Sequence, residues 1–135
     1  QDAQFAMPET SLGILPAQIA PFVVNRIGFT QARRLTLLGS RISGSEAREL
    51  GLVHFAEASA EAIDARLTDV LKQLKRCAPN ANANTKRLLH LTRQIPLTQA
   101  LDEAAVMFSQ AVTGAEGSEG TLAFVQKRPA TWAAD

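Results

Sequence analysis

The sequence has few residues of the types that build disulfide frameworks or metal sites. Its 135 residues include one cysteine and two histidines. Because a disulfide needs two cysteines, Cys77 cannot form one within the chain, which is typical of a protein from a reducing compartment, and we expect a cytoplasmic location. His54 and His90 are isolated, and no group of residues has the spacing of metal ligands, so no metal site is predicted.

Neither sign of charge dominates. The chain has 14 Lys and Arg against 13 Asp and Glu, for a net charge of +1. Such a balance gives no electrostatic signature of nucleic-acid or anionic-membrane binding, so neither partner is expected. The pairs Arg33-Arg34 and Lys75-Arg76 are interpreted as solvated helix faces rather than binding patches. No apolar run approaches the length of a membrane span, and neither a phosphate-binding glycine loop nor a nucleophile elbow is found.

What the sequence does contain is helical periodicity. Hydrophobic residues make up 46% and charged residues 20%, which is normal for one globular domain of this length. Proline, glycine and capping residues divide the apolar stripes into segments. Pro21 is expected to shorten or kink the first of them. The predicted helices cover residues 16–28, 31–38, 44–50 (opened by a capping box of Ser43 and Glu46), 61–78, 85–93, 97–112 and 118–127.

The non-helical segments are short. Residues 4–7 are predicted to form a strand, residues 52–55 a strand or an extended link, and residues 80–84 a polar link. The predicted fold class is therefore mainly α, with short strands near the N-terminus followed by a helical region. The small-residue turn at 58–60 is the expected boundary between regions 1–58 and 59–135. A bundle of these helices alone is the alternative architecture.

One carboxylate has an unusual sequence setting. Glu9 directly follows Pro8, whose ring fixes φ and biases the preceding residue toward extended geometry, so the strand delivers Glu9 in a defined direction. Phe5, Met7, Ile14 and Leu15 are expected to surround it with apolar side chains, which suits a general acid–base group. From residue types alone, a solvated loop glutamate is the more common interpretation.

Three blocks of sequence resemble successive segments of the crotonase family, the enoyl-CoA hydratases and isomerases. They occur in the family's order and span nearly the whole chain. They are Gln4-Phe5-x-x-Pro8-Glu9-x-x-x-Gly13-x-x-Pro16; Thr36-Leu37-Leu38-Gly39-Ser40-Arg41-Ile42-Ser43 followed by Ala47-x-x-x-Gly51-Leu52-Val53; and Glu119-Gly120-x-x-Ala123-Phe124-Val125-x-Lys127-Arg128-Pro129.

The resemblance implies a fold and an assembly. The chain would be the C-terminal part of a crotonase-like spiral of ββα turns, followed by helices that pack on neighbouring subunits in trimers or dimers of trimers. The family's subunit is about twice as long, and its earlier half holds the oxyanion-hole amides, much of the coenzyme A groove and, in hydratases, a second glutamate. The chain is therefore expected to be inactive alone.

The resemblance also implies a reaction. An enoyl-CoA hydratase adds water across the α,β double bond of an acyl-CoA thioester, with the coenzyme carried by the substrate and no separate cofactor. Glu9 matches the glutamate that exchanges a proton with the α carbon, and Ala17 the position whose amide helps to hold the water. The segment Ala17-Gln18-Ile19-Ala20-Pro21 resembles the methylglutaconyl- and isohexenylglutaconyl-CoA hydratase branch, which would place the protein in branched-chain or terpenoid acyl-CoA catabolism. An isomerase on the same scaffold and a non-catalytic helical oligomerisation module are the alternatives.

Phe124 and Lys127 match family residues that reach the coenzyme A of a neighbouring subunit. Their spacing is expected to place them on one face of the last helix. A lysine suits a phosphate as a compact point charge. The alternative for Phe124 is core packing, which its residue type favours, and for Lys127 it is a cation placed near a helix C-terminus.

Overall fold

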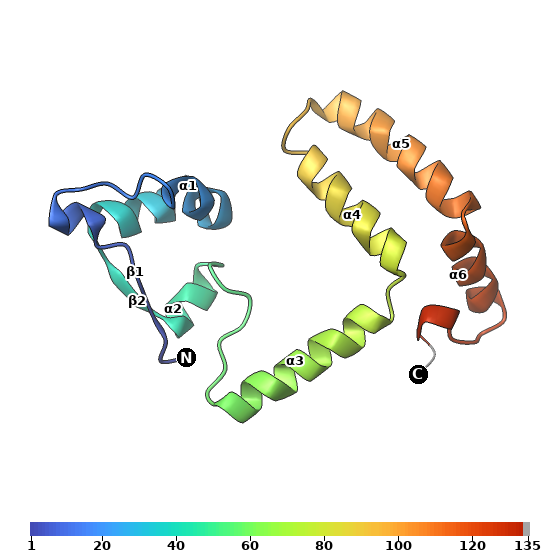
Figure 1. Ribbon diagram of the computed structural model, residues 1–135, viewed down its shortest axis with the longest axis horizontal. Coiled ribbons are helices and arrows are strands. Elements are labelled where there is room, and N and C mark those ends of the chain that lie inside the picture. The colour runs from blue at the N-terminus through green and yellow to red at the C-terminus, as the bar shows by residue number, and fades with distance from the viewer. Residues whose placement is uncertain (134–135) are drawn as a thin grey trace. The chain divides into compact units, whose positions relative to one another are not determined.

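The computed structural model describes residues 1–133, and these form two compact units (Figure 1). The first unit is residues 1–67 and the second begins at residue 68, so the division lies within the helix α3 (Ala60–Lys75). The predicted functional boundary at residues 58–59 lies earlier in the chain and stays a prediction. Each unit is described separately.

The first unit combines a small antiparallel sheet with helices. Its elements are β1 (Gln4–Ala6), a 3-10 turn η1 (Glu9–Leu12), α1 (Ala20–Leu37), β2 (Arg41–Ser43), α2 (Gly44–Glu49) and the start of α3. The register pairs Gln4 with Ser43, Phe5 with Ile42 and Ala6 with Arg41. The strand predicted at 4–7 is confirmed, whereas β2 was not predicted. Of the strand or extended link predicted at 52–55, the strand is not found: residues 52–54 form bends and residue 55 has no regular structure.

The core of the first unit lies between the sheet and the helices. One cluster contains Leu35, Ile42 and Ala47, and a second contains Met7, Val23 and Ala32. Ser43 and Glu46 form the predicted capping box, in which the Ser43 hydroxyl accepts from the Glu46 N–H and the Glu46 carboxylate accepts from the Ser43 N–H. This box starts α2 directly after β2, so a local signal fixes how the sheet leads into the helix.

The first helical pattern starts later than predicted. Its helix begins at Ala20 rather than near Pro16, and Pro21 lies in the first turn, where no helical hydrogen bond from its nitrogen is needed. The predicted break near Gly28 is confirmed, because this residue has φ 77° and ψ 162° inside α1. Gly39, with φ 56°, ends the second helical segment as expected.

The second unit is helical throughout its ordered elements. It contains the end of α3, then α4 (Pro79–Leu91), α5 (Leu97–Thr113), α6 (Ala115–Val125) and a 3-10 turn η2 (Thr131–Ala133). Trp132 packs this tail down: its indole Nε1–H donates to the Arg76 carbonyl at 3.2 Å, and its ring lies against Gly120. These contacts give Trp132, in the tail after Pro129, a packing role.

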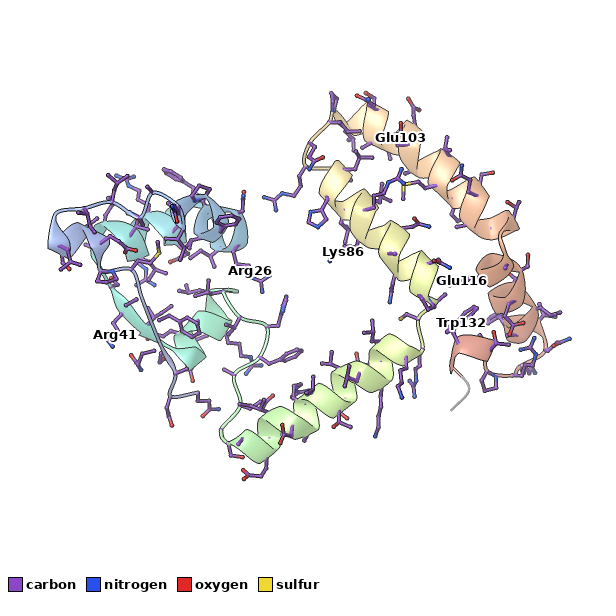
Figure 2. The ribbon with its side chains drawn as sticks, in the orientation of Figure 1. Arg26, Arg41, Lys86, Glu103, Glu116 and Trp132 are labelled. Carbon is purple, nitrogen blue, oxygen red and sulfur yellow. The ribbon has the colours of Figure 1, made fainter. Side chains whose placement is uncertain are left out.

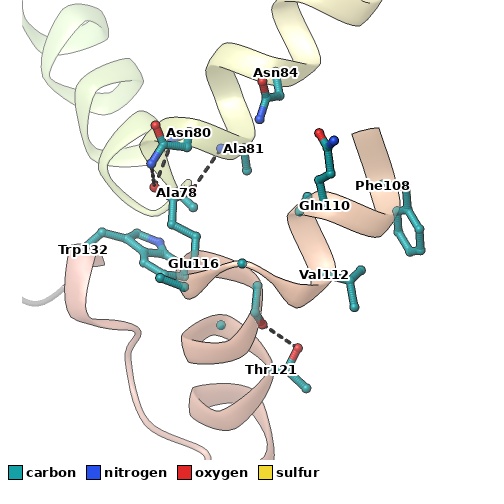
Figure 3. A pocket seen from close by; sticks show the side chains of 15 residues that line it. Ala78, Asn80, Ala81, Asn84, Phe108, Gln110, Val112, Glu116, Thr121 and Trp132 are labelled. Atoms are coloured by element: carbon teal, nitrogen blue, oxygen red, sulfur yellow. Dashed lines mark hydrogen bonds between the residues drawn. The ribbon is translucent and has the colours of Figure 1, made fainter. Parts of the chain in front are cut away.

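Helix α4 starts six residues before the predicted position, at Pro79 instead of residue 85. The cause is a carboxylate from another helix. Glu116 accepts hydrogen bonds from the Asn80 N–H at 3.0 Å, the Asn80 side-chain amide at 3.0 Å and the Ala81 N–H at 2.9 Å (Figures 2 and 3). Because a helix start leaves backbone N–H groups without partners, this carboxylate supplies the cap that the local sequence lacks.

The last helix is also displaced, covering Ala115–Val125 rather than 118–127. Gly117 lies inside it because α5 passes very close. A Cβ at Gly117 would meet the Ala111 carbonyl oxygen and would lie 2.8 Å from that of Val112. This glycine therefore permits a close helix–helix approach and does not loosen the chain.

Much apolar surface is uncovered in both units. Large hydrophobic side chains are exposed along α1, α3 and α5, which agrees with the expectation that several apolar helix faces need a further partner. Strongly exposed examples are Phe22 at 72% and Leu38 at 73% in the first unit, and Phe108 at 71% and Phe124 at 85% in the second. Among residues 1–133, no helix combines the length and the apolar character needed to cross a membrane.

Candidate functional site

The segment that carries Glu9 is held at both ends. Strand β1 leads into Met7, which is buried, and Pro8 precedes the η1 turn that begins at Glu9. The Thr10 hydroxyl donates to the Thr36 carbonyl at 2.9 Å, which ties the turn to the end of α1. The Ser11 hydroxyl donates to the Pro8 carbonyl at 2.6 Å and closes the turn itself. The backbone at Glu9 is therefore fixed by contacts on either side.

Gly39 lies directly against the same segment. A Cβ placed on it would lie 3.6 Å from the Thr10 hydroxyl, 3.8 Å from the Met7 carbonyl oxygen and 3.8 Å from the Pro8 Cα. Its positive φ favours glycine independently of this space. From the sequence, Gly39 was expected to end the helix before it. Its contact with the turn at Glu9 was not predicted.

The Glu9 carboxylate is the unusual group of this unit. Its Oε2 atom is buried and has no hydrogen-bond partner among the residues that the structure describes. A buried polar atom without a partner costs about 1–3 kcal/mol. Such an atom has lone pairs available for a proton or a hydrogen-bond donor from a bound molecule, which is what a general acid–base group requires.

The apolar surroundings of Glu9 differ from those predicted. Phe5 is half-buried and Met7 is buried, as expected for side chains on a strand that packs against the core. Ile14 and Leu15, however, are 59% and 72% exposed, so they do not enclose the carboxylate. The reason is local. The Ile14 N–H returns to the Glu9 carbonyl at 3.1 Å, and Gly13 with φ 74° turns the chain outward.

Ala17 lies in the same unit, in the turn before α1. Its N–H donates to the Leu15 carbonyl at 2.9 Å, across a three-residue turn. To donate to a bound water, the Ala17 N–H would therefore have to bond to both the water and the Leu15 oxygen, or break its hydrogen bond to Leu15. Between Glu9 and Ala17 themselves the described residues form no hydrogen bond.

Phe124 and Lys127 lie in the second unit, in different backbone states. Phe124 is in α6 and is 85% exposed, so the core-packing interpretation is wrong for this chain. Lys127 lies beyond the helix with φ 53°, so the two residues do not share a helix face. The Lys127 N–H donates to the Phe124 carbonyl and the Arg128 N–H to the Ala123 carbonyl, which is a Schellman motif with lysine at the position that usually holds glycine.

The segment that follows Lys127 is held by Glu119. Its carboxylate accepts two hydrogen bonds from the Arg128 guanidinium, at 2.7 and 2.8 Å, and one from the Thr131 N–H at 2.9 Å. The hydrogen bonds from Arg128 lower the pKa of Glu119 from 4.5 to about 2, helped by the Thr131 N–H and by the charge of Arg128, and opposed by desolvation. Lys127 thus lies in the chain between the end of α6 and the Arg128–Glu119 ion pair.

The two histidines do not form a site. Arg26 donates from Nε to the Leu52 carbonyl at 3.0 Å, and its Nη2 lies 3.1 Å from the His54 Nε2, so His54 has the structural surroundings expected of it. Within residues 1–133, no three side chains of His, Cys, Asp or Glu are grouped so that they could hold a metal ion.

Comparison with known proteins assigns the family. The model of the enoyl-CoA hydratase/isomerase family matches residues 1–135. The chain belongs to the enoyl-CoA hydratase/isomerase family. The fold agrees: the structure of Pseudomonas aeruginosa AtuE is 65% identical and superposes with a TM-score of 0.95 over 98% of this chain, which corresponds to 52% of AtuE.

Curated relatives of this family carry more than one activity in their names. The chain is 30% identical to the enoyl-CoA hydratase ACTT6 of Alternaria alternata, over 89% of its own length and 40% of that protein. It is 31% identical to the peroxisomal Delta(3,5)-Delta(2,4)-dienoyl-CoA isomerase of Arabidopsis thaliana, over 95% of its length and 46% of that protein. The chain thus spans less than half the length of these two relatives.

The second unit contains a pocket of its own. In the second unit, a cavity of about 500 Å³ lies between α4, α5 and α6, beside the Glu116 cap (Figure 3). Its walls include Ala81, Asn84, Ala111 and Val112. This pocket was not predicted, because its walls come from three separate helices.

Proposed function

We propose that this chain is the C-terminal portion of an enoyl-CoA hydratase, in which Glu9 is the general acid–base that exchanges a proton with the α carbon of the substrate. The observation that carries the proposal is the buried Glu9 Oε2, which has no partner among the described residues although its backbone is fixed on both sides. A carboxylate held in this way is preorganised to act on a bound molecule.

The reaction is a balanced addition of water to an α,β-unsaturated acyl-CoA. A base takes one proton from the water, and the resemblance places that base on the second glutamate of the family, in the half of the subunit that this chain does not match. The water oxygen then forms a bond to the β carbon as the π electrons of the double bond move into the thioester to give an enolate. Proton exchange with solvent passes the water's proton on and reloads the acid. The carbonyl re-forms when a proton is delivered to the α carbon. Glu9 holds that proton. Stabilisation of the enolate oxygen requires hydrogen-bond donors, which the resemblance assigns to the half of the family's subunit that this chain does not match.

The test of Glu9 is its replacement by glutamine in the full-length protein. Glu9→Gln keeps the shape and removes the proton-transfer group, so kcat should fall by about 10²- to 10⁴-fold. The control is Glu103→Gln, an exposed carboxylate on α5 (Figure 2), which should leave turnover unchanged. Turnover of Glu9→Gln within a factor of two of the wild type would reject Glu9 as the catalytic group.

An isomerase on the same scaffold is the second candidate, and the 31% identity to a protein named as a dienoyl-CoA isomerase favours it. The two reactions differ in mass. Hydration adds one water to the acyl-CoA, whereas isomerisation moves a double bond and leaves the mass unchanged. Mass spectrometry of the product from a single 2-enoyl-CoA therefore decides between them.

For the acyl group, we propose a branched substrate of the methylglutaconyl or isohexenylglutaconyl type. The support is the segment from Ala17 to Pro21, which departs from the glycine-rich sequence usual in straight-chain crotonases. Competing 3-methylglutaconyl-CoA against crotonyl-CoA tests this, and the branched substrate should have the higher kcat/KM. A preference for crotonyl-CoA would contradict the substrate class while leaving the Glu9 proposal standing.

Phe124 and Lys127 are proposed to contact coenzyme A across a subunit interface in a trimer or a dimer of trimers. The support is that both are exposed, with Phe124 at 85%, and that Lys127 keeps a backbone conformation costly for a side chain. Lys127→Gln should raise KM for acyl-CoA while kcat changes little, because a phosphate contact remote from the reacting atoms binds substrate and transition state alike.

A further inference from the structure

A group of cations gathers at the end of α3 and does not include Lys127. Lys72, Lys75 and Arg76 line an open groove of about 750 Å³ between the last turns of α3 and the C-terminal tail. Leu71 and Pro129 contribute apolar walls to the same groove. The sequence had indicated Lys75 and Arg76 only as a solvated helix face, because the tail that completes the groove follows more than fifty residues later.

The three cations have no neutralising partner in the part of the chain that the structure describes. They are spaced i, i+3 and i+4, so their charges lie on one face of the helix and repel one another. Two ion pairs, Arg66 with Glu57 and Arg128 with Glu119, lie elsewhere, and no carboxylate of residues 1–133 pairs with any of the three cations.

Capping of the helix end does not explain them either. Three carbonyls at this end accept from other groups. Within α3, that of Gln73 accepts from the Arg76 N–H and that of Leu74 from the Cys77 N–H, and just beyond it that of Arg76 accepts from the Trp132 indole. The side-chain cations are therefore not needed as hydrogen-bond donors to these carbonyls, and they remain available to a ligand.

We propose that this groove binds a phosphorylated small molecule that carries at least two negative charges. Charge-assisted hydrogen bonds from two lysines and an arginine match phosphate oxygens, and the Leu71 and Pro129 walls accommodate an attached apolar or planar group. The volume lies within the range of about 300–1,000 Å³ that small-molecule sites occupy, and the net charge of +1 does not suit a nucleic acid. The site is independent of the catalytic proposal for Glu9.

The sole tryptophan of the chain provides the measurement. Trp132 is bonded to the Arg76 carbonyl, so its fluorescence reports on the groove wall. Titration with pyrophosphate should give a saturable change that weakens with added salt, because the Debye length falls from about 10 Å at 0.1 M to about 3 Å at 1 M. Adenosine 3′,5′-bisphosphate should bind more tightly than pyrophosphate if the walls hold a nucleoside, and adenosine alone should not bind.

Matched variants locate the binding. The double variant K72Q/K75Q should weaken pyrophosphate binding by about tenfold or more, and K72R/K75R should retain it. The double variant K86Q/R87Q in α4 removes the same charge elsewhere and should bind like the wild type, as should Lys127→Gln. Absence of saturable binding, or equal loss in K72Q/K75Q and K86Q/R87Q, would overturn the proposal. Loss on Lys127→Gln alone would assign the phosphate to the coenzyme A contact instead.

Discussion

Glu116 and Glu119 of the second unit differ from Glu9 of the first in how their oxygens are bonded. In the second unit, Glu116 accepts three hydrogen bonds and so does Glu119, and both carboxylates hold separate segments together. In the first unit, Glu9 is equally well placed by its backbone, yet its buried Oε2 has no partner among the described residues. The oxygens of Glu116 and Glu119 are used to hold the fold together, whereas one oxygen of Glu9 is not used by the fold, as the proposed catalytic role requires.

The second unit has a comparable place of its own. Lys127 adopts a left-handed backbone conformation in which a glycine would be less strained. Both backbone hydrogen bonds of its Schellman motif are nevertheless formed. Glu9 and Lys127 thus share one property, which is a local cost to folding. At Glu9 the cost is a buried oxygen without a hydrogen-bond partner, and at Lys127 it is a left-handed backbone conformation. Such positions are where function is expected, because folding alone would not select them.

The largest stability effect should follow from breaking a satisfied carboxylate. Glu116→Ala removes all three hydrogen bonds at the start of α4 and should lower the unfolding free energy by about 1–2 kcal/mol. Denaturant melts of this variant and of Glu103→Ala provide the comparison, and the second should be close to wild type. Equal stability of the two would show that the Glu116 cap is not needed for α4.

Acid should release the Glu119 contact. Because the pKa of Glu119 is lowered from 4.5 in the unfolded chain to about 2, its contribution to stability is complete above about pH 4.5 and is lost as the pH falls toward 2. Trp132, one residue after the Thr131 N–H that Glu119 binds, should report this loss by fluorescence. The transition should be diminished in Glu119→Gln. An unchanged acid transition in that variant would assign it to other groups.

Relieving the strain at Lys127 should have a smaller effect of opposite sign. Lys127→Gly should raise the unfolding free energy by about 1 kcal/mol, because the left-handed conformation costs a side chain about that amount. Lys127→Gln keeps the side chain and should not be stabilised. If Lys127→Gly and Lys127→Gln unfold at the same denaturant concentration, the left-handed backbone at Lys127 does not lower the stability. Lys127 would then not resemble Glu9 in carrying a cost to folding.

The smallest stability change is expected at Glu9 itself. Glu9→Gln retains the shape of a side chain with one buried, unpartnered oxygen, so the unfolding free energy should change by less than about 0.5 kcal/mol. This outcome would separate the loss of turnover from loss of folding. A destabilisation as large as that of Glu116→Ala would mean that the Glu9 carboxylate is a structural group.

Local signals explain what could be predicted. The apolar periodicity of α3 and α5, the Ser43–Glu46 capping box and the Gly28 break all act within a few residues, and the structure confirms each of them. The start of α4 could not be predicted, because its cap comes from Glu116 in another helix. Strand β2 was missed for a similar reason, since three residues without clear alternation gain their structure by pairing with β1.

The candidate site was predictable only in part. Its sequence motif indicated Glu9, but not the vacant Oε2 or the support from Thr10 and Gly39, which depends on contacts with the end of α1. The prediction that Lys127 shares a helix face with Phe124 was wrong. A lysine rarely adopts a positive φ, so its residue type did not indicate this conformation.

The Glu116 cap also sets an order of events during synthesis. The cap of α4 cannot form until a residue 36 positions later has been synthesised. At about 5–20 residues per second, translation takes roughly 2–7 s to cover that distance. During this interval the Asn80 and Ala81 N–H groups can bond only to water, and the first turn of α4 is free to fray. The start of α4 is therefore stabilised only after Glu116 of α6 has been made.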